Sequence, residues 1–185
     1  MSRLAAVLAA IDAANSADPN IEEGCPASLL YGERMSAELD RLFPDASDLL
    51  QIAARGQHVE RWKLARKDYP EGRQGYLQWR REQARRHGAR LGEMMQDAGY
   101  SSTDTARVAQ MLLKSGLKRD AEVQALEDVI CFTLIRYYLL PFAEGRDQAE
   151  LVRIVTKSAL KMSPEGRARA LQEFELPPAF AAAFQ

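Results

Sequence analysis

Residues 120–141 read DAEVQALEDVICFTLIRYYLLP, and apolar residues recur around most of the circumference that a helix would have here. Asp120 can cap the N-terminus of this helix, and Pro141 can end it. A helix that is apolar on most of its sides has to be buried. We therefore expect this segment to lie at the centre of a helical bundle.

Helical periodicity continues on both sides of this segment, and no segment alternates convincingly with a period of two. Pro26 can open a helix, the run from Ser101 to Asp104 has the spacing of a capping box, and Ser163-Pro164 signals a further start. A helix capped by Asp45 or Ser47 is expected to run into His58 and Trp62, and another is expected from about Gly75 to Asp97. The sequence predicts an all-α fold, residues 1–185 forming a single helical domain of about seven or eight helices.

Composition is that of an ordinary globular protein: 185 residues, 46% hydrophobic and 28% charged. The longest apolar run, Val129 to Phe142, is interrupted by Arg136 and is too short to span a bilayer. The early apolar run ends at Asp12 without a convincing cleavage site. We expect a cytoplasmic protein that makes no membrane contact. The two cysteines lie far apart and form no CxxC pair, so a redox role is disfavoured.

Charge is distributed unevenly along the chain. Residues 55–90 contain eleven Lys or Arg and four Asp or Glu, although the whole chain has a net charge of −1. This basic segment contains both histidines. An anionic ligand would be attracted to it, whereas the protein as a whole is not a general binder of polyanions.

The two histidines, His58 and His87, and the buried-looking carboxylate of Asp128 lie on three different expected helices. Two imidazoles and a carboxylate from separate helices are a common way to build a metal or phosphate site in a bundle. The alternatives are that His58 caps helix carbonyls, that His87 lies on an exposed basic face, and that Asp128 forms an internal salt bridge. We take the three residues as candidate metal ligands.

Basic and aromatic residues near the histidines supply candidates for substrate binding. Arg61 and Arg66 could hold a phosphate, with Gln57 and Trp62 beside them. Lys114 could place an ammonium at the phosphate or merely complement a helix dipole. The tryptophans and tyrosines of this segment could stack nucleobases, although aromatics at helical spacing usually belong to a core. No P-loop, GxGxxG, GxSxG or HExxH motif is present.

A resemblance extends over most of the chain. It includes Gln57-His58-Val-Glu-Arg-Trp62, Gly75-Tyr-Leu-Gln-Trp-Arg80, Ala98-Gly-Tyr100 and Glu122 to Val129, and these segments look like the domain of unknown function 4202 family. That family implies no particular chemistry. A more distant similarity is to the HD superfamily of helical, metal-dependent phosphohydrolases, and it implies an HD-domain-like fold.

In that comparison His58, His87 and Asp128 would fill the first, second and last ligand positions. The chain departs from the pattern after His87, where Gly88 stands in place of the usual Asp. Three ligands could still hold one divalent ion with open positions for water.

The leading hypothesis is a metal-dependent phosphohydrolase-like enzyme that acts on a small phosphorylated or nucleotide-like metabolite. The divalent ion would be Mn, Fe, Co, Ni or Zn, or none, and Glu127 and Lys114 would assist catalysis. One rival is a non-catalytic module that binds RNA or another anionic ligand through residues 55–90. Another is a metal-free site in which His58 acts as a general base.

Overall fold

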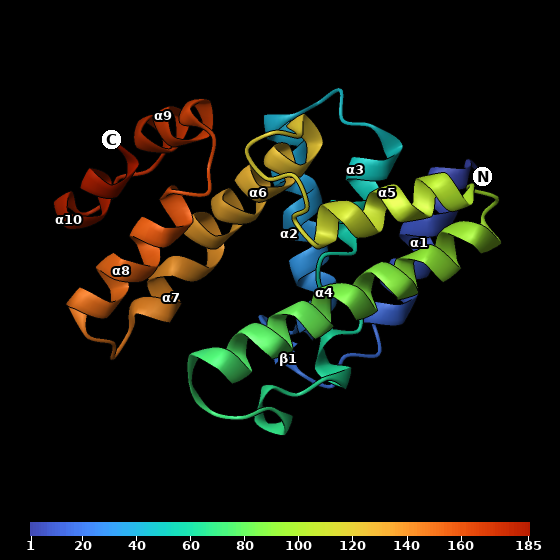
Figure 1. Ribbon diagram of the computed structural model, residues 1–185, viewed down its shortest axis with the longest axis horizontal. Coiled ribbons are helices and arrows are strands. Elements are labelled where there is room, and N and C mark those ends of the chain that lie inside the picture. Colours follow the sequence, from blue (N-terminus) through green and yellow to red (C-terminus); the bar gives the residue numbers. More distant parts are fainter. The chain divides into compact units, whose positions relative to one another are not determined.

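The computed structural model describes the backbone of residues 1–185 and the side chains of residues 1–139 and 141–185. The chain is helical almost throughout (Figure 1), which confirms the predicted all-α class. Its contacts group into two compact units, residues 1–115 and residues 116–185. The single domain expected from the sequence stays a prediction.

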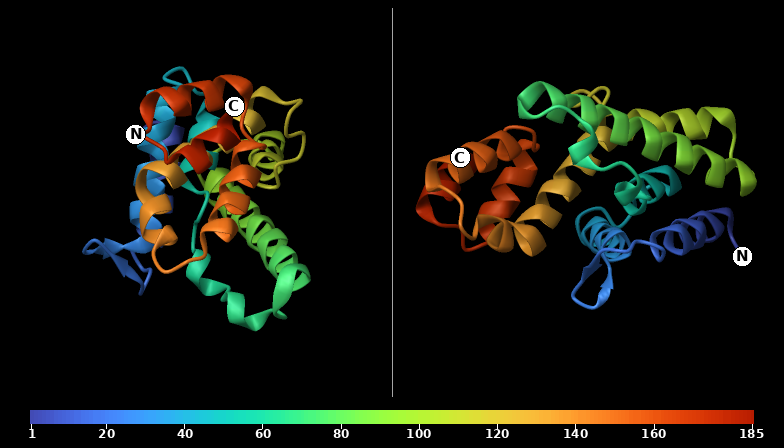
Figure 2. Two further views of the ribbon diagram at one scale, coloured as in Figure 1. Left: turned by 90° about the vertical axis from the view of Figure 1, so that its left-hand side faces the viewer. Right: turned by 90° about the horizontal axis from the view of Figure 1, so that it is seen from below.

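The first unit contains five α-helices, a short hairpin and two 3₁₀ turns within the described residues. In chain order these are α1 (Arg3–Asn15), β1 (Ile21–Glu22), β2 (Cys25–Pro26), α2 (Ala27–Leu42), α3 (Asp48–Arg55), η1 (Arg61–Lys63), η2 (Arg66–Asp68), α4 (Gly72–Asp97) and α5 (Ser102–Leu112). Helices α4 and α5 lie side by side over most of the length of α5, as both views of Figure 2 show. Buried aliphatic and methionine side chains form the core between the helices, among them Val7, Ile11, Met35, Leu39, Ile52, Leu91, Met95, Val108 and Met111.

Two features of this unit differ from the sequence predictions. A two-stranded hairpin pairs Ile21 with Pro26, and its turn residues Glu23 and Gly24 have φ angles of 51° and 80°. Such paired positive angles are typical of a type I′ turn, which needs only two residues and so leaves little periodicity to detect. Helix α3 ends at Arg55 and does not run on into His58. The left-handed φ of 51° at Glu60 is incompatible with a continuing helix.

The second unit contains α6 (Ala121–Thr133), the π-helical turn η3 (Leu134–Tyr138), α7 (Leu139–Ala143), α8 (Gln148–Ala159), α9 (Pro164–Glu173), α10 (Pro178–Ala181) and η4 (Ala182–Phe184). The single helix expected over residues 120–140 is therefore interrupted, because the Leu139 N–H bonds to the Leu134 carbonyl five residues back. Pro141 does not end the helix. It stands in the first turn of α7, where a missing N–H costs little.

The predicted start signals are confirmed. Ser101 and Asp104 form the capping box of α5, Asp120 caps α6, and Ser163 caps α9 with Pro164 in its first turn. The C-terminal tail packs within the second unit, because Phe180 and Phe184 are buried and η4 contacts α8.

Within the described residues, none of the helices is both long enough and apolar enough to cross a bilayer.

Candidate functional site

The first unit brings the two histidines together. His58 lies in the turn between α3 and η1, and His87 lies in the middle of α4. Their ring centroids are 6.4 Å apart, with the rings tilted by 40°. The pairing of the two imidazoles that the sequence analysis considered is therefore a feature of the tertiary structure.

His58 is held by an aromatic partner from α2. The ring of Tyr31 stacks on the imidazole with 3.6 Å between the centroids and 16° between the planes. One face of the imidazole is thereby covered, and the ring is restricted to rotation within the plane of the stack. The sequence analysis missed Tyr31, which has no local signal because it lies on a helix distant in sequence.

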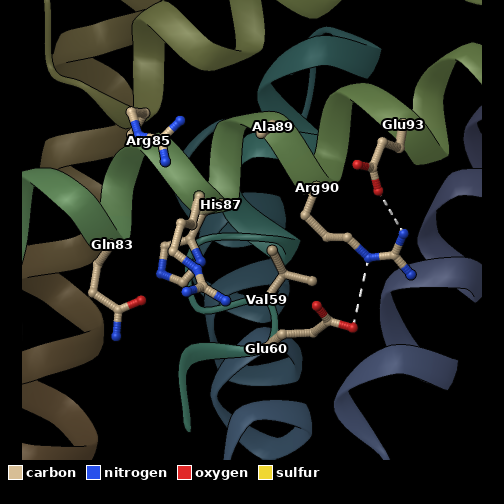
Figure 3. Close-up of a pocket in the computed structure, with 9 residues that line it drawn as sticks. Val59, Glu60, Gln83, Arg85, His87, Ala89, Arg90 and Glu93 are labelled. Carbon is tan, nitrogen blue, oxygen red and sulfur yellow. Dashed lines mark hydrogen bonds and ion pairs between the residues drawn. The ribbon is translucent and has the colours of Figure 1, made fainter. Parts of the chain in front are cut away.

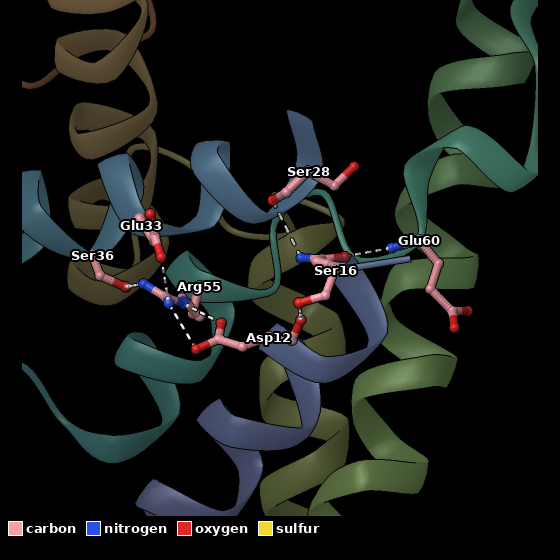
Figure 4. Close-up of polar contacts among 8 residues, drawn as sticks. Asp12, Ser16, Ser28, Glu33, Ser36, Arg55 and Glu60 are labelled. Atoms are coloured by element: carbon pink, nitrogen blue, oxygen red, sulfur yellow. Dashed lines mark hydrogen bonds and ion pairs between the residues drawn. The ribbon is translucent and has the colours of Figure 1, made fainter. Parts of the chain in front are cut away.

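The turn that carries His58 is tied to α1 by Asn15, which is 1% exposed. The Oδ1 atom of Asn15 accepts a hydrogen bond from the Glu60 N–H at 3.0 Å, and its Nδ2 donates to the Ser28 carbonyl at 3.3 Å. Figure 4 shows Ser28 and Glu60 on the two segments that this amide connects. Because α2 begins next to Ser28 and carries Tyr31, Asn15 fixes both partners of the ring stack.

Helix α4 supports the rest of the turn with two polar side chains. The indole Nε1 of Trp79 donates to the Leu64 carbonyl at 3.0 Å. The Nε2 atom of Gln83 donates to the carbonyls of Arg61 and Leu64 at 2.9 and 3.0 Å. The guanidinium carbon of Arg61 lies 4.6 Å from the centre of the Trp79 ring, a cation–π arrangement. Trp79 is buried, as predicted for a core aromatic, but it also carries a cation on its face.

Burial and nearby positive charges both lower the pKa values of the two imidazoles. Burial first, and then the charges of Arg61, His87, Arg80 and Lys114, hold the pKa of His58 well below its ordinary value. For His87, burial and then Arg61 lower the pKa to about 4, against a hydrogen bond to the Val59 backbone that raises it. Both rings are therefore neutral at neutral pH.

The pKa of Arg61, which lies near the two imidazoles, is lowered by the same two causes. Burial, followed by the nearby charge of Arg80, lowers the pKa of Arg61. Within the part of the chain that the structure describes, neither Arg61 nor Arg80 has a carboxylate within ion-pair distance. We refer to these residues together as the histidine–arginine cluster: Tyr31, His58, Arg61, Trp79, Arg80, His87 and Lys114.

A cavity of about 220 Å³ lies beside the cluster (Figure 3). His87 lines it together with Val59, Glu60, Gln83, Arg85, Arg86, Ala89, Arg90 and Glu93. Several of the charged side chains that line the cavity already form ion pairs. Arg90 contacts Glu93 at 2.8 Å and Glu60 at 3.6 Å, and Arg85 contacts Glu82 at 2.7 Å. His87 thus borders both the cluster and an open space large enough for a small anion.

Asp128 belongs to the second unit, where it has a structural partner. Its Oδ1 accepts hydrogen bonds from the Ser163 N–H at 2.8 Å and from Gln124 Nε2 at 3.1 Å, and its Oδ2 accepts one from the Ser163 hydroxyl. Ser163 in turn caps α9 through the Gly166 N–H. The buried carboxylate therefore anchors the N-terminus of α9.

Of the three predicted metal ligands, His58 and His87 belong to the first unit and Asp128 belongs to the second. Among the residues whose side chains are described, no three His, Cys, Asp or Glu side chains form such a group. The first unit supplies two imidazoles, which is one ligand fewer than a catalytic zinc site normally has. The predicted metal set of His58, His87 and Asp128 stays a prediction.

Gly88, the position at which the chain departs from the HD pattern, has a packing explanation. A Cβ atom on Gly88 would lie 3.1 Å from the Cβ and 3.3 Å from the Cα of Ala109 on α5. An aspartate there would push α5 away from α4. A glycine at this position therefore allows the close packing of α4 against α5.

The other candidates lie in varied surroundings. Arg66 donates to the carbonyls of Tyr69 at 2.9 Å and Gly72 at 3.4 Å, so its guanidinium braces the loop before α4. Gln57 has a buried Oε1 without a partner among the described residues, Trp62 is partly buried, and Glu127 is buried on α6. Lys114 is near enough to affect the pKa of His58. Their predicted roles in catalysis and substrate binding are not tested by these contacts.

Arg80 is the second functional candidate that the sequence analysis missed. A signal for it does exist, because Arg80, Gln83 and His87 are separated by three, four and seven residues on one long helix. That spacing places them on one face of α4. The run of arginines around them obscured the pattern.

Comparison with known proteins identifies one family. A model of the family described as Domain of unknown function (DUF4202) matches residues 5–183. No curated protein and no solved structure matches the chain.

Proposed function

The chain belongs to the DUF4202 family, and from the chemistry of its first unit we propose that it binds a small molecule carrying a phosphoryl group. The observation that carries this proposal is the pair Arg61 and Arg80, which lies beside two neutral imidazoles and has no carboxylate within ion-pair distance among the described residues. A phosphoryl group would supply negative charge to these two guanidinium groups.

The partial burial of Arg61 indicates that an anion would stabilise this site. Moving a guanidinium out of water is unfavourable unless a counter-charge or hydrogen-bond acceptors replace the lost hydration. Arg61 is partly buried and its pKa is lowered mainly by that burial. The face of Trp79 compensates in part, since a cation–π contact contributes roughly 0.5–2 kcal/mol. An anion between Arg61 and Arg80 would offset the remainder.

A small anion fits this surface better than RNA does. Several bases of the segment 55–90 are already engaged inside the fold. Arg55 holds Asp12 with two contacts of 2.7 Å (Figure 4), Lys63 holds Glu60, and Arg85 holds Glu82. Nucleic-acid affinity depends on many free cations that contact successive phosphates. Burial lowers the pKa of Arg61, which has Arg80 beside it, so one phosphoryl group at this pair would offset more desolvation than contacts with the exposed bases elsewhere in the segment.

An HD-like phosphohydrolase activity is the second candidate, and one observation favours it. The two imidazoles lie 6.4 Å apart and are neutral at neutral pH, so each has an unprotonated nitrogen, and their lowered pKa values make both of them weak bases. This activity is independent of the binding proposal, because a bound phosphate monoester need not be hydrolysed. Release of phosphate from p-nitrophenyl phosphate, with and without added Mn²⁺ or Zn²⁺, would test it.

The binding proposal is tested by calorimetric titration with inorganic phosphate and pyrophosphate at low ionic strength. We expect Arg80→Gln to weaken binding at least tenfold. Arg81→Gln is the matched control, because Arg81 is exposed like Arg80 and is the next residue on the same helix, but it is not part of the cluster. Equal binding by the two variants, or no binding by the wild type, would remove the cluster from the proposal.

A further inference from the structure

The cluster contains one nitrogen, Nε2 of His87, that acts as a hydrogen-bond acceptor, whereas the cationic side chains near it are hydrogen-bond donors. His87 is 4% exposed, and its Nε2 has no hydrogen-bond partner among the described residues. The hydrogen bond that the ring makes to the Val59 backbone must therefore come from the other nitrogen, Nδ1. A ring that donates through Nδ1 and is neutral presents a lone pair at Nε2. Nε2 is thus a buried acceptor.

The groups that face this acceptor keep it unprotonated. The ring of His58 lies 6.4 Å from that of His87 between centroids, and Glu60 lines the same cavity as His87. The positive charges of Arg61, Arg86 and Arg80 lower the pKa of His87 in addition to burial. The carboxylate of Glu60 is engaged by Lys63 at 2.8 Å. The pKa of His87, lowered to about 4 chiefly by burial, keeps the ring neutral at any pH near 7.

A ligand that satisfies the whole cluster needs two kinds of oxygen. The guanidinium groups require negatively charged oxygens that accept hydrogen bonds, whereas Nε2 requires a donor. Inorganic phosphate has both, because it retains a hydroxyl at neutral pH. A phosphate monoester has a hydroxyl below its second pKa, about 6. Sulfate and phosphodiesters have charged oxygens but no hydroxyl.

Resting on the phosphoryl-binding function proposed above, we propose that His87 selects phosphoryl groups that carry a hydroxyl, by accepting its hydrogen bond at Nε2. Gln57 supports this selection, because its Oε1 is a second buried acceptor without a partner in the described part of the chain and it lies next to His58 in sequence. The ligand class is therefore inorganic phosphate or the monoanion of a phosphate monoester.

Sulfate is the sharpest comparison, since at neutral pH it matches hydrogen phosphate in shape and in charge but cannot donate. Calorimetric titration of the wild type at pH 7.5 should give a dissociation constant at least tenfold lower for phosphate than for sulfate. For the same reason, methyl phosphate should bind more tightly at pH 5.5 than at pH 7.5, while the weak binding of dimethyl phosphate should not change.

The variant His87→Phe keeps a ring of similar size and removes the acceptor. It should bind phosphate and sulfate with similar constants. Should this variant fail to fold, the ¹⁵N resonance of His87 Nε2 in the wild type provides a second measurement. Phosphate should shift that resonance toward a hydrogen-bonded acceptor, and sulfate should not.

The outcomes separate the two proposals. If neither anion binds, the phosphoryl-binding function is wrong. If both bind equally to the wild type, the function stands and the selection by His87 is wrong. A preference for phosphate that persists in His87→Phe, or an Nε2 resonance that ignores phosphate, would also overturn the selection.

Discussion

Both units of this protein bury ionisable side chains on helices, but they satisfy them differently. Asp128 in the second unit accepts three hydrogen bonds from Ser163 and Gln124, all within its own unit. His87 in the first unit has a fixed donor at Nδ1 and an acceptor at Nε2 without a partner among the described residues. Fully satisfied groups stabilise a fold, whereas an unsatisfied buried group is available to a ligand. The comparison therefore distinguishes a structural carboxylate from a candidate binding residue.

The largest expected effect tests whether Asp128 stabilises the fold of the second unit. Asp128→Ala removes every acceptor that holds Ser163 and leaves buried donors unpaired, so we expect the free energy of unfolding to fall by about 3 kcal/mol. The affinity for phosphate should not change in the folded fraction. Denaturant titration and calorimetry measure the two quantities.

Asp147→Ala is the matched control for that substitution. Asp147 caps α8 through the Glu150 N–H, and both residues are solvent-exposed or nearly so. Loss of an exposed cap costs roughly 1 kcal/mol. Equal destabilisation by the two alanine variants would show that the buried network around Asp128 adds nothing.

The next largest effect is a dependence of stability on pH that arises from His87 in the first unit. Above pH 6.5 His87 is neutral in both the folded and unfolded chain and contributes no pH dependence. Between pH 6.5 and about 4 the unfolded chain binds a proton that the folded chain does not, so stability falls as the pH falls. For this one residue the loss is about 3 kcal/mol at most, since one pKa unit corresponds to about 1.4 kcal/mol.

Urea denaturation of the wild type and His87→Gln at several pH values from 4 to 7.5 measures this loss. The variant should show the shallower dependence on pH. Saturating phosphate at pH 5.5 should stabilise the wild type more than His87→Gln. Parallel curves for the two proteins would mean that the imidazole of His87 titrates normally and is not buried as described.

A smaller effect is expected from a substitution of Asn15, which connects the turn that carries His58 to the start of α2. Asn15→Ala removes the two hydrogen bonds that join Glu60 and Ser28, so we expect a loss of about 2 kcal/mol in stability and several-fold weaker phosphate binding. Ring-current shifts of His58 from its stack on Tyr31 report the local geometry. Unchanged shifts together with unchanged affinity would restrict Asn15 to a purely structural role.

Much of the fold could be predicted from local patterns. Capping residues such as Ser101 and Ser163 marked helix starts correctly, because a cap depends on residues within one turn of each other. The π turn at Leu134–Tyr138 and the end of α3 at Arg55 were missed. Both involve changes of backbone conformation inside segments whose residue pattern stays helical.

The candidate site was predicted only in part. The sequence analysis singled out His58, His87 and Arg61 because rare imidazoles stood among clustered bases, and the structure groups these three. It assigned Asp128 to a metal site, whereas the contacts of Asp128 described here are with Ser163 and Gln124. A buried carboxylate requires a partner, but the sequence does not say which partner it will find.

What the sequence by itself determined is the helical class, most helix starts and the position of the basic segment, because these depend on residues that are neighbours along the chain. Only the tertiary structure decided that Tyr31 of α2 stacks on His58. It also decided that, among the described residues, Arg61 and Arg80 have no carboxylate within ion-pair distance and Nε2 of His87 has no hydrogen-bond partner. These features arise from contacts between segments far apart in sequence. Whether a polar atom is satisfied depends on the groups that folding brings around it.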